Sequence, residues 1–247
     1  MFANKVVIVT GGSAGIGAAT AECFAKEPIV GRNETKLNNV KERIEKLGAK
    51  VLVIKADVTK EDEAVTIVKQ TVDKFGKVDV LVNNAGIVRT ARIDESNVMA
   101  IYDEVMNTNL RSIVHITSLA TPYLKETKGN VVNVSTFATT KIPFPAMSAY
   151  IMSKASLDHF TKAAAIELAS FGVRVNAVNP GLVVTDIFET FDLSGYIGQE
   201  LKGEDSSLLG RMAEANEIAD LIVYMASDKA KSITGSCYLI DNGGVLK

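Results

Sequence analysis

A tyrosine and a lysine four residues apart, Tyr150 and Lys154, are the pair in this 247-residue sequence best suited to proton transfer. Residues at this spacing share one face of a helix, so a phenol and an ammonium group can lie side by side. The pKa of a free tyrosine is about 10, and a nearby positive charge stabilises the phenolate and lowers that pKa. The pair can then donate or accept a proton near neutral pH. Such pairs are also common on solvated helices, so the spacing by itself permits catalysis without establishing it.

A glycine-rich segment near the N-terminus has the composition of a phosphate-binding loop. It reads Thr-Gly-Gly-Ser-Ala-Gly-Ile-Gly over residues 10–17 and directly follows a run of β-branched residues. Glycines allow the backbone to turn tightly and to approach a pyrophosphate closely, and the helix that follows offers free N–H groups. The spacing differs from the common GxGxxG pattern, and an ordinary tight turn would also explain the glycines. The place of the loop after a first strand favours dinucleotide binding.

The residues after the expected second strand indicate which nicotinamide cofactor is used. A carboxylate there would bond the ribose hydroxyls of NAD, whereas an arginine accommodates the 2′-phosphate of NADP. The sequence has Arg32 and Asn33, with no carboxylate before Glu34. Arg32 could bind a phosphate through two charge-assisted hydrogen bonds, although a solvated arginine at a loop edge is the alternative. We therefore expect NADP(H) rather than NAD(H), even though Ala14 stands where a second basic residue would strengthen the case.

These residues lie at the ends of apolar runs that alternate with long amphipathic segments. Such alternation is typical of a parallel sheet with right-handed crossovers and helices on both faces. No linker or repeat interrupts it, so we expect one domain over residues 1–247, a doubly wound Rossmann-type α/β fold in three layers. The expected strands are 6–9, 51–54, 78–82, 131–134, 173–178 and 238–240, and the expected helices are about 15–26, 34–47, 60–75, 97–125, 148–170 and 213–225.

Two segments depart from this regular alternation. If the first helix runs to Lys26, only residues 28–30 remain for a second strand, fewer than the five or six of a typical strand. The sequence therefore predicts either a truncated strand or the omission of a few residues near Pro28. We favour omission, because the first strand would otherwise be exposed on one side. The other segment, at about 186–210, connects a strand to a helix and is long enough to be a lid over a substrate site.

Composition and charge argue against several other classes of protein. The net charge of −2 offers no electrostatic basis for binding nucleic acid or an anionic membrane. No apolar run reaches the roughly 18–20 residues of a membrane span, and the N-terminus lacks a secretory pattern, so we expect a cytoplasmic location. Cys23 and Cys237 are expected to be buried, reduced thiols. Together with the two histidines they lack zinc-ligand spacing, so no metal is expected.

Taken in order, the motifs along this chain resemble those of the short-chain dehydrogenase/reductase family. Each motif is modestly specific, but all seven in this order, across essentially the whole chain, are very specific. They are the loop at 10–17, Asp57-Val58, Asn83-Asn84-Ala85-Gly86, Asn109, Ser135, Tyr150 with Lys154, and Asn179-Pro180-Gly181 with Thr185.

The resemblance implies a role for each matching residue. Tyr150 would exchange the proton, Ser135 would hold the substrate oxygen, and Lys154 would also bond the nicotinamide ribose. Asn109 would kink its helix and hold a water that joins Lys154 to solvent. The implied catalytic residues are therefore Asn109, Ser135, Tyr150 and Lys154, and the implied cofactor-binding residues are Gly11, Ser13, Gly15, Ile16, Gly17, Arg32, Asn33, Asp57, Val58, Asn84, Ala85, Gly86, Tyr150, Lys154, Pro180, Gly181, Val183 and Thr185.

An apolar pocket wall and a catalytic set together suggest the reaction. We expect an NADP(H)-dependent carbonyl reductase or alcohol dehydrogenase that acts on a lipophilic ketone, aldehyde or secondary alcohol. A 3-oxoacyl-thioester reductase, which would share the catalytic set, and a catalytically silent NADP-binding redox sensor remain as alternatives. The resemblance also implies a homodimer or homotetramer formed through the helices that carry Asn109 and Tyr150. The expected pocket wall consists of Phe137, Phe144, Met147, Leu182, Ile187, Phe188, Phe191 and Tyr196.

Overall fold

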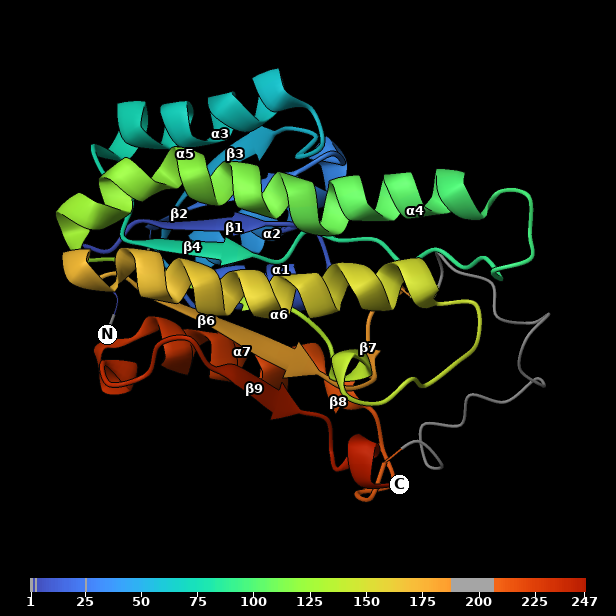
Figure 1. The fold of residues 1–247 in the computed structure, drawn as a ribbon. Helices are drawn as coiled ribbons and strands as arrows, with labels where there is room; N and C mark the ends of the chain where they lie inside the picture. Colours follow the sequence, from blue (N-terminus) through green and yellow to red (C-terminus); the bar gives the residue numbers. More distant parts are fainter. Residues whose placement is uncertain (1, 3, 25, 188–206) are drawn as a thin grey trace.

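The computed structural model describes residues 2, 4–24, 26–187 and 207–247, and its centre is a seven-stranded parallel sheet (Figure 1). The strand order is β3-β2-β1-β4-β5-β6-β9, so the chain changes direction across the sheet between β1 and β4. This order is that of a doubly wound Rossmann-type domain, and the predicted fold class is confirmed. The strands are β1 (Val7–Thr10), β2 (Lys26–Gly31), β3 (Lys50–Lys55), β4 (Val80–Asn83), β5 (Asn130–Val134), β6 (Arg174–Pro180) and β9 (Cys237–Ile240).

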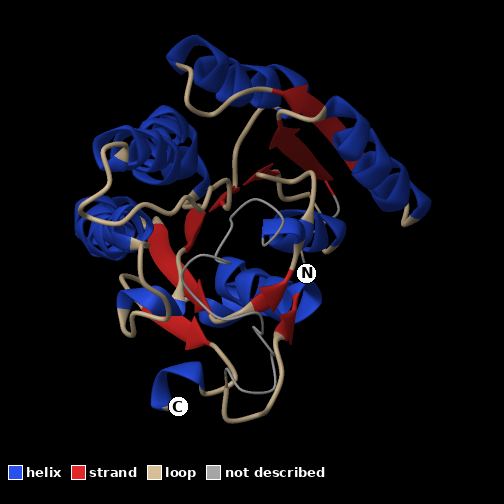
Figure 2. Ribbon diagram, turned by 90° about the vertical axis from the view of Figure 1, so that its right-hand side faces the viewer, coloured by secondary structure: helices blue, strands red, loops and turns tan. Residues whose placement is uncertain are grey.

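Helices cover both faces of the sheet, as Figure 2 shows from the carboxyl ends of the strands. One face packs against α1 (Gly15–Glu22), α2 (Glu34–Lys46) and α7 (Ala215–Ala226). The other packs against α3 (Glu61–Phe75), α5 (Ser112–Thr127) and α6 (Ser148–Leu168). Each face has its own apolar core, because neighbouring residues of a strand point to opposite faces.

The second strand is complete, because the first helix ends earlier than the sequence predicted. Helix α1 ends at Glu22, and the N–H groups of Cys23 and Phe24 bond carbonyls three residues back. Phe24 is buried and meets Phe2 edge to face at 4.7 Å between ring centroids. The expected helix to Lys26 is therefore wrong. So is a truncated strand, since all six residues of β2 pair with β3, and Ile29 and Val30 also pair with β1. Because α1 ends at Glu22, enough residues remain for a full second strand, and the reason for expecting an omission near Pro28 no longer applies.

The single helix expected over 97–125 is interrupted at Asn109. Helix α4 (Val98–Met106) passes into a π-helical segment, Asn107–Arg111, before α5 begins. In this segment the Asn109 side chain accepts a hydrogen bond from the Ile87 N–H (2.8 Å) and donates one to the Ile87 carbonyl (2.9 Å). π-helical turns often occur at functional sites. The helix distortion that the resemblance implied at Asn109 is confirmed in this form.

The structure also contains a two-stranded sheet that the sequence analysis did not predict. Strands β7 (Val183–Val184) and β8 (Ala213–Glu214) pair as a small parallel sheet that brackets the predicted substrate loop at 186–210. Residues 188–206 of that loop lie outside the described residues.

Cys23 is exposed and Cys237 only partly buried, so the expected burial of both thiols is wrong. Within the described parts of the chain, no helix is long and apolar enough to cross a membrane.

Thr10 joins the carboxyl ends of β1 and β4, where the sheet changes direction. Its buried hydroxyl accepts hydrogen bonds from the N–H groups of Asn84 (3.0 Å) and Ala85 (3.1 Å). The Asn84 side chain donates in turn to the carbonyls of Thr10 (3.0 Å) and Gly11 (3.2 Å). The glycine loop and the loop after β4 are therefore held as one unit.

Replacing Thr10 by valine should lower the free energy of unfolding by about 1–3 kcal/mol, because two amide N–H groups lose their acceptor. Thr10→Ser keeps the hydroxyl and is the matched control, with a smaller loss expected. Urea denaturation measures both variants. Wild-type stability in Thr10→Val, together with a loss in Thr10→Ser, would show that the methyl group, and not the hydroxyl, holds the two loops.

Candidate active site

A groove runs along the carboxyl ends of the strands where the sheet changes direction, the usual place for a ligand in this architecture. It encloses about 420 Å³. Most predicted cofactor residues of the first half of the chain line it together. They are Gly11, Ser13, Gly15, Ile16, Arg32, Asn33, Asp57, Val58, Asn84, Ala85 and Gly86, and Thr185 joins them from the second half.

The glycine loop forms a cradle that larger side chains would fill. Gly15 has φ +53°, and a Cβ there would lie 3.0 Å from Thr185. Gly17 does not line the groove. Its absent side chain lets α1 approach the loop, since a Cβ there would lie 2.2 Å from the Gly11 carbonyl oxygen and 2.5 Å from the Asn84 amide. The loop therefore presents backbone N–H groups at the start of α1, which fits the phosphates of a dinucleotide.

Asp57 and Arg32, two charged residues that the sequence analysis singled out, also line the groove. The Asp57 carboxylate accepts hydrogen bonds from the Thr59 N–H (3.0 Å) and hydroxyl (2.7 Å). Burial raises the pKa of Asp57, but these hydrogen bonds and the charges of Arg32 and Lys60 bring it below its ordinary value. Arg32 thus lies near Asp57 with its own side chain exposed. The Asn33 side chain caps α2 by accepting a hydrogen bond from the Lys36 N–H (3.0 Å).

A smaller apolar cavity of about 140 Å³ opens beside the groove. Several residues line both spaces, so the two are continuous: Ile16, Asn84, Gly86, Ile87, Thr185 and Ile187. Ser135, Tyr150 and Lys154 face the cavity, as do Pro180, Gly181 and Val183. The expected apolar wall also lies there, formed by Phe137, Phe144, Met147, Leu182 and Ile187. Phe188, Phe191 and Tyr196 lie outside the described residues.

Lys154 is buried, and its ammonium group is held at the end of β5. Its Nζ donates a hydrogen bond of 2.7 Å to the Val134 carbonyl. Burial lowers the pKa of Lys154 to about 8, while the carboxylate of Asp158 acts in the opposite direction. The amine is therefore mainly charged at neutral pH and loses its proton in mildly alkaline solution.

Tyr150 is partly buried one helical turn before Lys154. Burial raises its pKa, and a hydrogen bond with the Thr136 side chain acts in the opposite direction. The lowering expected from the neighbouring ammonium is therefore not found in the protein without cofactor, because loss of hydration disfavours the phenolate more. In this state Tyr150 is a protonated phenol.

The other two predicted catalytic residues differ in their access to the cavity. Ser135 lines it, and its hydroxyl lies 3.4 Å from the Lys154 carbonyl. Asn109 is fully buried and lines neither space. Besides the Ile87 backbone, its amide donates to the Ser153 hydroxyl (3.2 Å), next to Lys154. Asn109 therefore holds α6 against the loop after β4.

The cavity walls also include residues that the sequence analysis did not single out. Ile87 and Val88 directly follow the Asn-Asn-Ala-Gly motif, and Thr136 follows Ser135. Adjacency to a motif was thus a usable signal for these three. Pro143 reaches the cavity from a loop without any such signal.

The chain is similar to known oxidoreductases along nearly its whole length. A family model described as enoyl-(acyl carrier protein) reductase matches residues 11–244. The 3-oxoacyl-[acyl-carrier-protein] reductase of Thermotoga maritima is 35% identical in an alignment of 255 positions that covers 98% of each chain. A short-chain dehydrogenase of Burkholderia cenocepacia, solved with NADP, is 29% identical with a TM-score of 0.90, over 98% of each chain. A 7α-hydroxysteroid dehydrogenase, solved with NADH and 7-oxo glycochenodeoxycholic acid, is 27% identical with a TM-score of 0.91, over 100% of this chain and 96% of that one.

A family match of this extent identifies the class of protein. The chain belongs to the short-chain dehydrogenase/reductase family. It is an oxidoreductase that acts on CH–OH donors with a nicotinamide cofactor as acceptor.

Replacing Gly17 by alanine should raise the Kd for NADPH at least tenfold, because the new Cβ would displace the Gly11 carbonyl or the Asn84 amide from the loop. Fluorescence titration of the cofactor measures this loss. Ala18→Gly, one residue further along α1, is the control for loosening the helix without entering the loop. An unchanged affinity in Gly17→Ala would contradict the close packing of α1 on the loop.

Proposed function

We propose that this protein reduces the 3-oxo group of an acyl thioester with NADPH as the hydride donor. The observation that carries the proposal is the continuity of the apolar cavity at Ser135 and Tyr150 with the cofactor groove. The name of the relative from Thermotoga maritima supports the acyl-thioester substrate. The sequence analysis favoured a carbonyl reductase and kept a 3-oxoacyl-thioester reductase as an alternative. The similarity to the Thermotoga maritima enzyme supports the alternative better.

The proton chemistry follows from three side chains at the cavity. Pro180, Gly181, Val183 and Thr185 would hold the nicotinamide ring of NADPH at the cavity, where it would supply the hydride. The Ser135 hydroxyl donates a hydrogen bond to the substrate carbonyl oxygen and fixes its place. The Tyr150 phenol donates its proton to the same oxygen as the carbon is reduced. The Lys154 ammonium, next to it on α6, stabilises the phenolate that remains until solvent returns a proton.

A lipophilic ketone or secondary alcohol is the second candidate substrate. The cavity wall supports it, since Phe137, Phe144, Met147 and Leu182 present apolar side chains beside Tyr150. The bile-acid derivative bound by the 7α-hydroxysteroid dehydrogenase is a ketone of this kind, held by a similar fold. An acyl chain and a steroid-like ketone would both gain from burial there.

The preference for NADPH rests on the basic side chains at the open end of the groove. Arg32 and Lys36 both line it next to Asn33. Lys36 also forms a 2.7 Å ion pair with Asp186 across the groove. A guanidinium group at this position can hold the 2′-phosphate through paired hydrogen bonds.

Assembly as a homodimer or homotetramer through α5 and α6 is part of the same proposal. Apolar side chains are exposed on these helices and just beyond α6, with 40% exposure for Val114, 80% for Ile166 and 44% for Phe171. A second copy of the chain would cover them.

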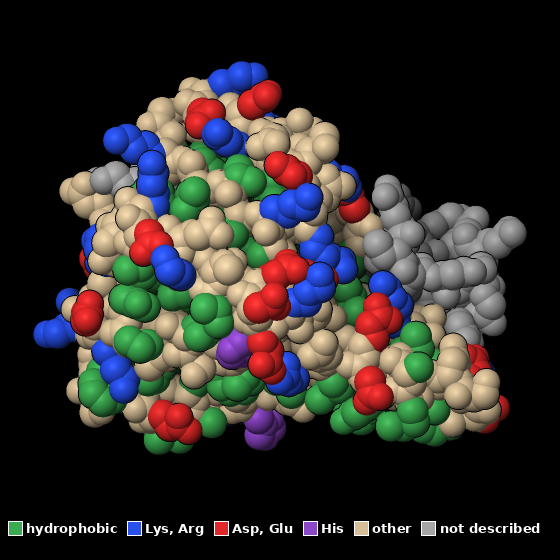
Figure 3. Space-filling view, turned by 90° about the horizontal axis from the view of Figure 1, so that it is seen from above, with side chains coloured by type: hydrophobic (Ala, Val, Ile, Leu, Met, Phe, Trp, Pro, Cys, Tyr) green, Lys and Arg blue, Asp and Glu red, His purple; other side chains and the backbone are tan. Residues whose placement is uncertain are grey.

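Figure 3 shows the face seen from above, where Lys and Arg are interspersed with Asp and Glu, so this face offers no single-sign patch for an anionic polymer.

A substrate panel tests the proposal directly. NADPH oxidation should be fast with 3-oxoacyl thioesters, and Tyr150→Phe should lower kcat by at least a thousandfold while the Kd for NADPH stays within about threefold. Turnover confined to steroid-like or other free ketones would transfer the assignment to the second candidate. Tight NADPH binding without any turnover in the wild-type protein would favour the redox sensor.

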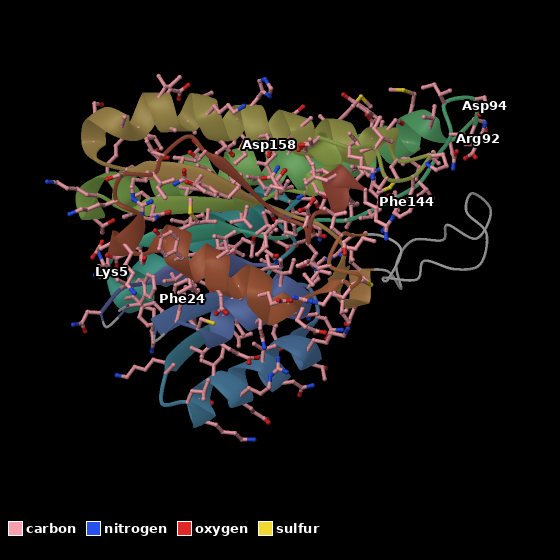
Figure 4. All side chains as sticks on the ribbon, turned by 90° about the horizontal axis from the view of Figure 1, so that it is seen from below. Lys5, Phe24, Arg92, Asp94, Phe144 and Asp158 are labelled. Carbon is pink, nitrogen blue, oxygen red and sulfur yellow. The ribbon has the colours of Figure 1, made fainter. Side chains whose placement is uncertain are left out.

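Replacing Arg32 by alanine should weaken NADPH binding about tenfold to a hundredfold, the loss expected for a charge-assisted pair of hydrogen bonds. NADH, which lacks the 2′-phosphate, should bind as before. Arg92→Ala is the matched control, since Arg92 pairs with the exposed Asp94 (Figure 4) and lines neither the groove nor the cavity. Equal weakening of NADPH and NADH would show that Arg32 does not recognise the 2′-phosphate.

A further inference from the structure

Two buried polar residues near Lys154, Asp158 and Asn179, are hydrogen-bonded to each other. Asp158 follows Lys154 by one turn of α6 and is 9% exposed, and Asn179, in β6, is 5% exposed. The Asn179 amide nitrogen donates a 2.9 Å hydrogen bond to the Asp158 carboxylate. Figure 4 shows Asp158 on α6 toward the interior of the molecule. Neither residue lines the groove or the cavity.

We propose that Asp158 and Asn179 are positioning residues that hold Tyr150 and Lys154 in place for proton transfer. The inference rests on the proposed function and adds residues that the family motifs do not include in the proton-transfer set. Its basis is the set of segments that the pair ties together.

The Asn179 amide connects the ends of two strands with α6. Besides Asp158, its nitrogen bonds the Thr136 carbonyl (3.2 Å) and the Thr139 hydroxyl (3.3 Å). Thr136 follows Ser135 and bonds the Tyr150 phenol through its own side chain. Asn179 also directly precedes Pro180 and Gly181 at the cavity. One amide thus fixes the spacing between the segment beside Tyr150, the cavity wall and the helix that carries Lys154.

The carboxylate of Asp158 has a second effect through its charge. A buried carboxylate is costly unless an opposite charge or hydrogen bonds compensate it, so an apolar residue would be the ordinary choice at an inward helix position. Here the negative charge favours the charged form of Lys154 against its burial. On α6 the titratable neighbours of Lys154 are Asp158 and Tyr150. The strands and the π-helical segment present uncharged groups to it, the Val134 carbonyl and the Asn109 amide.

The isosteric change Asp158→Asn removes the charge and keeps the size. In this variant kcat should fall at least tenfold, while the Kd for NADPH stays within about twofold of wild type. The fall of kcat/KM at alkaline pH should also begin at lower pH, because Lys154 loses the charge that keeps it protonated. Asp220→Asn, at an exposed position of α7, is the matched control and should leave both quantities unchanged. Wild-type kcat and an unshifted pH profile in Asp158→Asn would overturn the proposal.

Asn179→Ser distinguishes the positioning of Tyr150 and Lys154 from the effect of the Asp158 charge. It also tests the proposal if Asp158→Asn does not fold. It keeps the carboxylate and removes the amide, so kcat should fall with the alkaline limb unmoved and NADPH affinity retained. Wild-type kcat in this variant, or a loss of cofactor affinity equal to the loss of kcat, would overturn the positioning role.

A readout without turnover distinguishes this inference from the proposed function. If the wild-type protein reduces no carbonyl compound, the proposed function fails, and the Lys154 Nζ resonance can still be titrated by nitrogen NMR, with Lys154→Arg to assign it. A lower titration midpoint in Asp158→Asn than in wild type supports the coupling. The same midpoint in both proteins overturns it.

Discussion

The buried ammonium group of Lys154 is the constraint on which the site depends. An amine placed in the interior loses hydration and tends to lose its proton, which is why its pKa falls to about 8. Its charge survives at neutral pH because the Val134 carbonyl accepts its hydrogen bond and Asp158 lies one turn away. The same burial raises the pKa of Tyr150 and keeps its phenol protonated. Burial therefore favours, before any cofactor binds, the ionisation states of both groups that the proposed reduction requires.

The fold supplies the rigid surroundings that such a site requires. Thr10 and Asn84 lock the glycine loop to the end of β4, and Gly17 lets α1 approach that loop. Asn109 continues the arrangement by bonding Ile87 on one side and Ser153 on the other. Amide side chains serve well here because each donates and accepts at once. Groove, cavity and α6 are thus connected by buried hydrogen bonds rather than by apolar packing alone.

The local features of this fold and site were predictable from the sequence, and the tertiary ones were not. Strand–helix alternation and the spacing of Tyr150 and Lys154 are short-range patterns, and both predictions agree with the structure. The end of α1 depends on Phe24 packing against Phe2, a contact between distant residues. The pairing of Asp158 with Asn179 likewise joins residues 21 apart. The direction of the Tyr150 pKa shift depends on burial, which sequence spacing does not report.

The pH dependence of carbonyl reduction by the unmodified protein tests the central role of Lys154 most directly. At subsaturating substrate, kcat/KM reports the ionisation of groups in the form of the enzyme that binds the substrate. The account predicts a level profile at neutral pH that falls as the pH rises through about 8, where Lys154 loses its proton. A profile that stays level to about pH 10, the ordinary range of lysine and tyrosine, would contradict it.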